Sequence, residues 1–284
     1  IRDLVRSRGL GDVYKRQYYN STIFSGLFCI NNKKSKLFYD KKRHFSGGTS
    51  MIGIIGAMDI EINAVKSKIE NPVTTKHAGV EFVCGNVGSV TVCAAMCGPG
   101  KVNAAICTQA MIDIFKADEI INIGVGCSLS QDVVIKNIVV ASDVCQYDID
   151  ITALGEPRGY INGLNTVKIE TDAEISETLS RIAINSGERI HRGTVASGDT
   201  FIADENLKSF LAEHFGAICG EMEGGAIGQV CAANNIPFAV LRSVSDGGDA
   251  SAALDYPTFK KIAAEKSTAI IIKYILSRET QLEF

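Results

Sequence analysis

Acidic residues stand beside apolar runs at three places in the chain, and they are the residues best suited to chemistry. Glu61 follows a glycine-containing turn, Glu221 and Glu223 flank Met222 just before an Ala/Gly-rich segment, and Asp246 ends a long apolar run. An acid next to buried apolar residues is unfavourable unless a hydroxyl or a cation meets it. The pattern indicates a polar ligand and carboxyl groups that can exchange protons with it.

Each acid also has a structural explanation when it is taken alone. Glu61 lies where an acid in the first turn of a helix complements the helix dipole. Asp246 lies where a carboxylate can cap a turn. The coincidence of several such acids favours a ligand site over separate structural roles.

Two glycine-containing segments also follow apolar runs. Gly98-Pro99-Gly100-Lys101 lies between a predicted strand and a helix, where its glycines let a ligand or a strand approach the backbone. Its glycine spacing differs from that of a phosphate-binding loop, which favours a solvated or structural role for Lys101. Gly124-Val125-Gly126-Cys127-Ser128 is predicted to close a strand, either as a platform for a flat ligand or as a tight chain reversal.

From Met51 onward, short continuous apolar runs alternate with helical segments, as expected for strands covered on both faces by helices. Helices are expected in the gaps between strands, and the last one is the clearest, with apolar residues every three or four positions from Phe259 to Tyr274. We expect a single α/β domain with a central, largely parallel or mixed twisted sheet flanked by helices. Ligands of such sheets bind beyond the carboxyl ends of the strands. Strands are predicted at Ile52–Ile55, Val90–Cys97, Ile120–Ile123, Ile138–Ala141, Thr194–Ser197 and Phe238–Val244.

The composition of the 284-residue chain fits a globular protein and excludes several functional classes. A net charge of −3 gives no basic surface for nucleic acid, and the four histidines lack the spacing of a zinc site. No apolar stretch reaches the roughly 18 residues of a membrane span. The nine cysteines include no C-x-x-C pair, and several lie in apolar runs. We therefore expect buried thiols in a reducing compartment rather than disulfides or metal ligands.

Residues 1–50 differ from the rest of the chain. They hold eleven Lys/Arg against three Asp/Glu and show neither helical nor strand periodicity. We expect residues 51–284 to form the domain, and residues 1–50 to be an extension outside it, such as a cloning scar, spurious upstream translation or a leader. Met51 is the expected natural start.

Six motifs in residues 51–277 together resemble the methylthioadenosine/S-adenosylhomocysteine nucleosidases, members of the nucleoside phosphorylase superfamily. Each motif is weak alone, but the set is specific. The resemblance implies a nucleoside phosphorylase-like fold and hydrolysis of the N-glycosidic bond of 5′-methylthioadenosine and S-adenosylhomocysteine. The motifs are I-G-I-I-G-A-M-x-x-E (52–61), G-x-G-K-V-x-A-A (98–105), D-I-D-I-T-A-L-G (148–155), S-G-D-x-F-I (197–202), E-M-E (221–223) and S-D (245–246).

The resemblance implies a role for each matching residue. Asp246 would be the general acid at adenine N7, with Ser245 beside it. Glu223 would hold the ribose hydroxyls, and Glu61 would position the attacking water with help from Arg242. The substrate-binding residues implied by the resemblance are Phe201, Ile202 and Met222 around the purine, Tyr256 over the 5′-alkylthio group, Pro99, Val125 and Gly126 in the pocket, and Leu154 in the pocket of the neighbouring subunit.

Two positions depart from the family pattern. Val125 stands where the family often has a serine, which bears on the orientation of Asp246, and Pro99 replaces an aliphatic residue, which bears on pocket shape. Water is the expected nucleophile, because the loop after the first strand carries Asp59 and Glu61 and no cation for phosphate.

Other functions remain open on the sequence. They are a purine nucleoside phosphorylase, a hydrolase of another purine nucleoside, and a purine-binding protein without catalysis. The resemblance implies a homodimer that takes a small adenosine thioether. The charge balance and the short apolar stretches indicate neither nucleic acid nor membrane as a partner, and the expected thiols indicate the cytoplasm. The chemistry requires no metal or redox cofactor.

Overall fold

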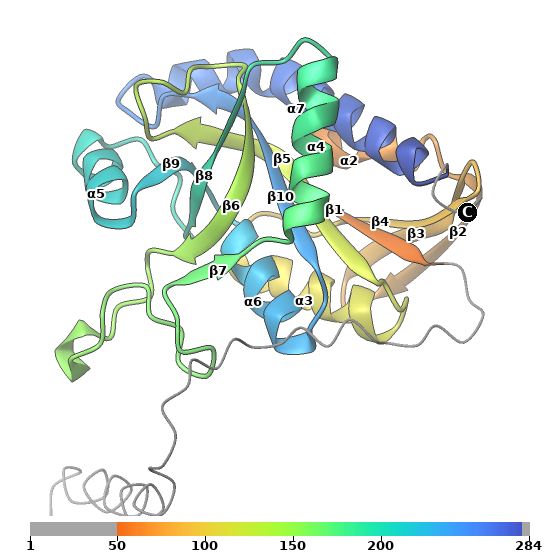
Figure 1. Cartoon of the computed structure of the whole chain (residues 1–284), viewed down its shortest axis with the longest axis horizontal. Coiled ribbons are helices and arrows are strands. Elements are labelled where there is room, and N and C mark those ends of the chain that lie inside the picture. The colour runs from red at the N-terminus through yellow and green to blue at the C-terminus, as the bar shows by residue number, and fades with distance from the viewer. Residues whose placement is uncertain (1–49, 280–284) are drawn as a thin grey trace, which may run out of the picture. The chain divides into compact units, whose positions relative to one another are not determined.

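The computed structural model describes residues 50–279, and its elements carry the labels of Figure 1. The expectation of an extension outside the domain falls on residues 1–50, of which all but Ser50 lie outside the described residues. Within the described residues, no helix combines the length and the apolar character needed to cross a membrane.

The described chain alternates strands and helices along most of its length. The strands are β1 (Met51–Gly56), β2 (Glu70–His77), β3 (Val80–Val87), β4 (Val90–Met96), β5 (Glu119–Ser128), β6 (Ile138–Gln146), β7 (Lys168–Glu170), β8 (Ile190–Ser197), β9 (Ala217–Glu221) and β10 (Phe238–Asp246). The helices are α2 (Asp59–Lys66), α3 (Lys101–Asp113), the short 3-10 helix η2 (Thr152–Leu154), α4 (Ala173–Asn185), α5 (Glu205–Phe215), α6 (Gly224–Asn234) and α7 (Ala252–Glu279).

These strands form one mixed sheet. The spatial order is β10-β6-β8-β9-β5-β1-β4-β3-β2, with β7 paired to β6. Because β10 also pairs with β5, the strands β10, β6, β8, β9 and β5 close a ring, from which β1, β4, β3 and β2 extend. The pairs β1–β4, β1–β5, β5–β10, β6–β8 and β8–β9 are parallel. The predicted α/β class with a largely parallel or mixed sheet is confirmed.

Helices cover both faces of the sheet, which explains the continuous apolar runs. Helices α3 and α6 lie on one face, and α2, α4 and α7 lie on the other (Figure 1). Neighbouring residues of a strand point to opposite faces. Thus Ile55 packs in the core with Met111 of α3, whereas Ile54 packs in the core with Ile62 of α2 and Ile271 of α7.

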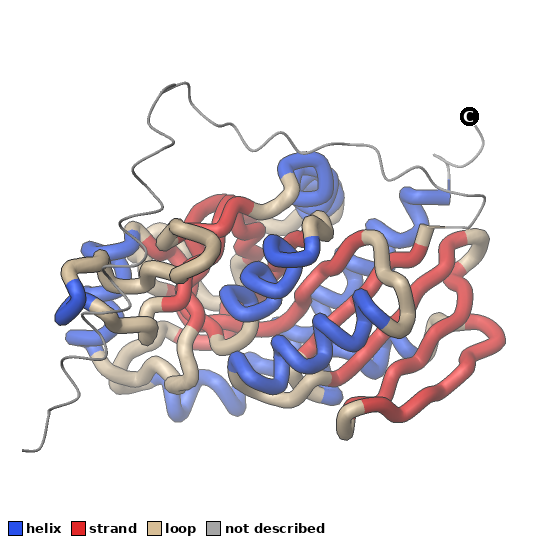
Figure 2. The backbone as a smooth tube through the Cα atoms, turned by 90° about the horizontal axis from the view of Figure 1, so that it is seen from below, coloured by secondary structure: helices blue, strands red, loops and turns tan. Residues whose placement is uncertain are grey.

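The expectation that helices fill every gap between the predicted strands is wrong for residues 70–87. This segment forms the antiparallel hairpin β2–β3, at the edge of the sheet (Figure 2). All eight residues of β2 are exposed, so an apolar face could not mark this strand in the sequence. The sequence does not reveal strand β9 for a different reason: it is mostly buried, but it has only five residues and ends in Gly-Glu.

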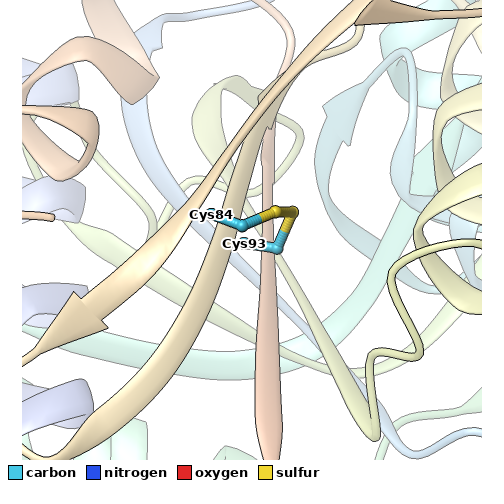
Figure 3. The surroundings of a disulfide bond; sticks show 2 residues. All are labelled: Cys84 and Cys93. Atoms are coloured by element: carbon cyan, nitrogen blue, oxygen red, sulfur yellow. A yellow bond between two sulfur atoms is a disulfide. The ribbon is translucent and has the colours of Figure 1, made fainter. Parts of the chain in front are cut away.

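The expectation that all cysteines are free thiols is wrong for Cys84 and Cys93, which form a disulfide between β3 and β4 (Figure 3). Gly88 and Ser89 connect the two strands, so the pairing of Val87 with Val90 sets Cys84 opposite Cys93. Their Cα atoms are 4.1 Å apart. The spacing of the two cysteines about this turn is the signal that a count of C-x-x-C pairs overlooks. Six other cysteines are free and buried, at positions 97, 107, 127, 145, 219 and 231, and Cys29 lies outside the described residues.

Candidate active site

A cavity of about 260 Å³ lies at the edge of the sheet where β1, β5 and β10 end. This is the edge at which ligands of α/β sheets bind. The cavity brings together every predicted site residue except Arg242 and Leu154. Its walls are made by Ala57, Met58, Glu61, Pro99, Val125, Gly126, Cys127, Thr200, Phe201, Ile202, Gly220, Glu221, Met222, Glu223, Ser245, Asp246 and Tyr256.

Glu61 is held in the cavity wall by three backbone N–H groups. Its Oε2 accepts from Ala57 at 2.7 Å and from Met58 at 2.9 Å, and its Oε1 accepts from Val125 of β5 at 3.0 Å. The residue therefore completes the start of α2, as a structural acid would, and also reaches the cavity. Burial raises the pKa of its carboxyl, while the charge of Arg242 and the N–H donors oppose the rise.

Arg242 lies beneath the cavity in β10 and is almost fully buried. Its Nη2 forms an ion pair with Glu221, donates to Asn122 Oδ1, and lies 3.7 Å from Glu223 Oε2. The predicted cooperation of Arg242 with Glu61 takes a different form here. The Nη1 of Arg242 donates to the backbone carbonyl of Leu241 at 3.1 Å, and the guanidinium acts on Glu61 through its charge.

Glu223 ends the E-M-E segment and stands at the N-terminus of α6. Its Oε1 accepts the backbone N–H of Gly100 at 2.9 Å. Burial and the neighbouring Glu221 carboxylate raise the pKa of Glu223, and Arg242 opposes this rise. Because Gly100 holds Oε1, the orientation of the Glu223 carboxyl in the cavity wall is fixed. The carboxyl can accept hydrogen bonds from the hydroxyl groups of a ligand.

Asp246 is the last residue of β10, and its two carboxyl oxygens have different partners. Ser245 Oγ donates to Oδ2 at 2.8 Å, and the backbone N–H of Gly248 donates to Oδ1 at 3.0 Å. The second contact is the turn cap considered above, so Asp246 both caps a turn and lines the cavity. Burial raises its pKa in spite of these donors, which favours retention of a proton towards neutral pH.

The turn predicted at residues 124–128 is wrong, because strand β5 continues to Ser128. Its glycines are required by close approach. A Cβ on Gly124 would lie 2.8 Å from Glu61 Oε1, and one on Gly126 would lie 2.7 Å from Cys219 Sγ. The absence of a side chain at Gly124 thus leaves room for the Glu61 carboxyl against β5.

Apolar side chains form the remaining walls. Phe201 and Tyr256 meet edge to face, with ring centroids 5.5 Å apart. Ile202 is buried, whereas Phe201 is 46% exposed at the mouth of the cavity. A flat apolar group with polar edges, such as a purine, fits walls of this kind.

Comparison with known proteins identifies the family. The profile of the phosphorylase superfamily matches residues 51–276. The chain is 33% identical over 225 residues to the 5′-methylthioadenosine/S-adenosylhomocysteine nucleosidase of Haemophilus influenzae strain PittEE, a match that covers 79% of this chain and 98% of the relative. The chain belongs to the phosphorylase superfamily, among the methylthioadenosine/S-adenosylhomocysteine nucleosidases.

Solved structures of similar proteins have the same fold. A Helicobacter pylori 5′-methylthioadenosine/S-adenosyl homocysteine nucleosidase in a ligand complex has a TM-score of 0.78 and 30% identity, covering 81% of this chain and 99% of the other. A second H. pylori structure, a futalosine hydrolase mutant, has a TM-score of 0.78 and 29% identity, covering 81% of this chain and all of the other. The predicted fold class and family are confirmed.

One predicted site residue of this nucleosidase family member lies away from the cavity. Leu154 is on η2, outside the cavity of its own chain, and is 77% exposed.

Glu221 lines the cavity although the sequence predicted no role for it. It accepts from Ser197 Oγ, from Arg242, and from the N–H groups of residues 223 and 224. The E-M-E motif pointed to it, but its inward direction follows from β9, which the sequence did not reveal.

Proposed function

We propose that this chain hydrolyses the N-glycosidic bond of 5′-methylthioadenosine and S-adenosylhomocysteine, releasing adenine and the 5-thioribose. The observation that carries the proposal is the convergence of Glu61, Glu223 and Asp246 on one cavity, from segments far apart in the sequence. The nucleosidases to which the chain is similar support the choice of substrate.

The three carboxyl groups divide the chemistry between them. Breaking the bond leaves the sugar cation-like and sends electrons into the purine, so a proton donor must meet the base. Asp246 donates that proton to N7, and Glu223 accepts hydrogen bonds from the ribose hydroxyls. Glu61 orients the attacking water and accepts the proton that the water loses when its oxygen bonds to the sugar carbon. An acid and a water-positioning carboxyl on opposite sides of the scissile bond are the arrangement of inverting glycosidases.

Water is preferred to phosphate because the cavity offers no free cation. No Lys or Arg stands among its lining residues in the described part of the chain. The buried Arg242 is paired with Glu221 and lies close to Glu223. A phosphate dianion beside these carboxylates would lack the arginine-rich surroundings that such an ion requires.

The decisive experiment is product analysis on purified protein in phosphate-free buffer. The proposal expects adenine release from methylthioadenosine and from S-adenosylhomocysteine without added phosphate. Inosine and futalosine belong in the panel, the latter because one similar structure is a futalosine hydrolase. Formation of a sugar phosphate only when phosphate is present would refute the hydrolase, and binding without turnover would favour the purine-binding alternative.

We also propose that two copies of the chain form a homodimer in which Leu154 of one completes the pocket of the other. The exposed apolar side chains of Leu154 on η2 and Val102 on α3 support this. Light scattering should give twice the chain mass, and Leu154→Asp should raise KM. A monomeric active enzyme would refute the proposal.

The cytoplasm is the compartment that we propose. Six buried free thiols support it, because unpaired cysteines suit a reducing compartment. The disulfide of Cys84 and Cys93 is the exception, because a reducing compartment disfavours it. Alkylation of denatured, unreduced protein taken directly from cells should find both cysteines as reactive thiols, and finding them oxidised would refute the cytoplasm.

A further inference from the structure

Lys101, Asp148 and Asp199 connect three loops beside the cavity, and we call these three residues the loop latch. Lys101 opens α3, Asp148 follows β6, and Asp199 follows β8. Lys101 Nζ forms an ion pair with Asp148 Oδ1. The backbone N–H of Asp199 donates to Asp148 Oδ2 at 3.0 Å, and that of Lys101 donates to Asp199 Oδ1 at 2.7 Å. Each residue therefore contacts the other two.

On one side, the loop latch reaches the carboxyl group of Glu223. Gly100 precedes Lys101 and donates its backbone N–H to Glu223 Oε1 at 2.9 Å. Its φ angle is +98°, and a Cβ at this position would lie 3.0 Å from Asp199 Oδ1. The turn that holds Glu223 is therefore in close contact with Asp199, and it requires glycine at position 100.

On the other side, the loop latch holds the segment that supplies an apolar wall of the cavity. Asp199 directly precedes Thr200, Phe201 and Ile202, all of which line the cavity. The Asp199 backbone is fixed by Asp148, which belongs to a different loop. The side chains of Lys101 and Asp148 are only 16% and 29% exposed, so solvent screens their attraction incompletely.

We propose that the loop latch is a positioning device that fixes the ribose-binding carboxyl and the purine-stacking wall relative to each other. Lys101 is a positioning residue that does not line the cavity. Its side chain holds Asp148, which fixes the Asp199 backbone ahead of Phe201, and its own backbone directly follows Gly100, which binds Glu223. The inference rests on the proposed function for its kinetic consequences. Its structural half, the ordering of two loops by one lysine, does not depend on the substrate.

The test compares Lys101→Met and Asp148→Asn with Lys266→Met in the full chain. Lys266 is a matched control because it forms an ion pair with Glu188 at similar exposure, 27% and 20%, and does not line the cavity. Hydrogen exchange of the free proteins measures the order of residues 98–104 and 198–202. Steady-state kinetics on methylthioadenosine and its 2′-deoxy analogue measure the function of Glu223.

The latch variants should exchange faster in both segments and lose about 10-fold in kcat/KM for methylthioadenosine, as expected when a charge-assisted contact is removed. The 2′-deoxy analogue should lose less, because it makes fewer hydrogen bonds to Glu223. Lys266→Met should change neither exchange nor discrimination.

Unchanged exchange in the two segments would overturn the proposal, as would a loss that is equal for both substrates. If the wild-type chain released no adenine, the proposed function would fail. The exchange comparison would still decide whether the latch orders the two loops.

Discussion

Two buried carboxyl groups lie along strand β5 and are held in different ways. One belongs to Glu119, the first residue of β5, and the other to Glu61 of α2, which contacts Val125 of β5. At its start, Glu119 accepts from Tyr274 Oη at 2.8 Å and from Arg278 Nη2 at 2.9 Å, both on α7. Towards its other end, Glu61 accepts from backbone N–H groups and faces a cavity. Burial raises the pKa of both groups.

The difference indicates a structural role for Glu119 and a carboxyl available to a ligand for Glu61. Arg278 forms a direct ion pair with Glu119, which offsets the unfavourable burial of the charge. Backbone donors fix the position of Glu61 but leave its charge without a cation in direct contact among the described residues. A carboxyl of the second kind is destabilising for the fold and available to a substrate, which is the usual relation between stability and activity at such sites.

Replacement of Asp246 by Asn should produce the largest change. It removes the proposed proton donor, so kcat should fall about 10²- to 10⁴-fold. Because burial raises the pKa of Asp246, its contribution to stability is present below the unfolded pKa and is lost as pH rises through the folded pKa. Urea unfolding of Asp246→Asn at neutral pH should therefore show a stability equal to or above that of the wild type. A large loss of stability with retained turnover would reverse the comparison.

The opposite outcome is expected for Glu119→Gln. Tyr274 and Arg278 lose a charged acceptor, so the free energy of unfolding should fall by about 1–3 kcal/mol, while kcat/KM for methylthioadenosine stays unchanged. Urea denaturation and initial rates measure the two quantities. A drop in activity without a drop in stability would show that the start of β5 is not merely structural.

A smaller effect is expected from Ser245→Ala. The Ser245 hydroxyl lowers the pKa of Asp246, so its removal raises that pKa and keeps the acid protonated to higher pH. The alkaline limb of kcat/KM should move to higher pH.

Ser243→Ala is the matched control for this variant. Its hydroxyl is also buried in β10 and has no hydrogen-bond partner among the described residues, so its alkaline limb should stay in place. A shift of the limb to lower pH in Ser245→Ala would contradict the role of Asp246 as the acid.

The sequence predicted most of the residues that line the cavity, because each acid adjoins a recognisable apolar run or motif. Glu61, Glu223 and Asp246 are of this kind, and all three line the cavity. Glu221 was singled out with the other acids but was given no role, because a short strand ending in Gly-Glu carries no periodicity that would show its direction. Its ion pair with Arg242 joins β9 to β10, and a local sequence pattern does not predict such a contact between strands.

The fold was predictable where burial shapes composition and unpredictable where it does not. Strands covered on both faces, such as β1 and β10, read as apolar runs. The hairpin β2–β3 presents a wholly exposed strand, and the disulfide depends on cross-strand register rather than on cysteine spacing alone. Gly124 and Gly126 were mistaken for a turn because glycine marks both chain reversal and close approach.

The ring of strands has a consequence for how the molecule is made. Strand β10 lies between β5 and β6, which leave the ribosome long before it. Until β10 emerges, a nascent chain carries an unfilled gap in its sheet and lacks both Arg242 and Asp246. A single late strand therefore completes both the ring of the sheet and the cavity wall that holds Asp246.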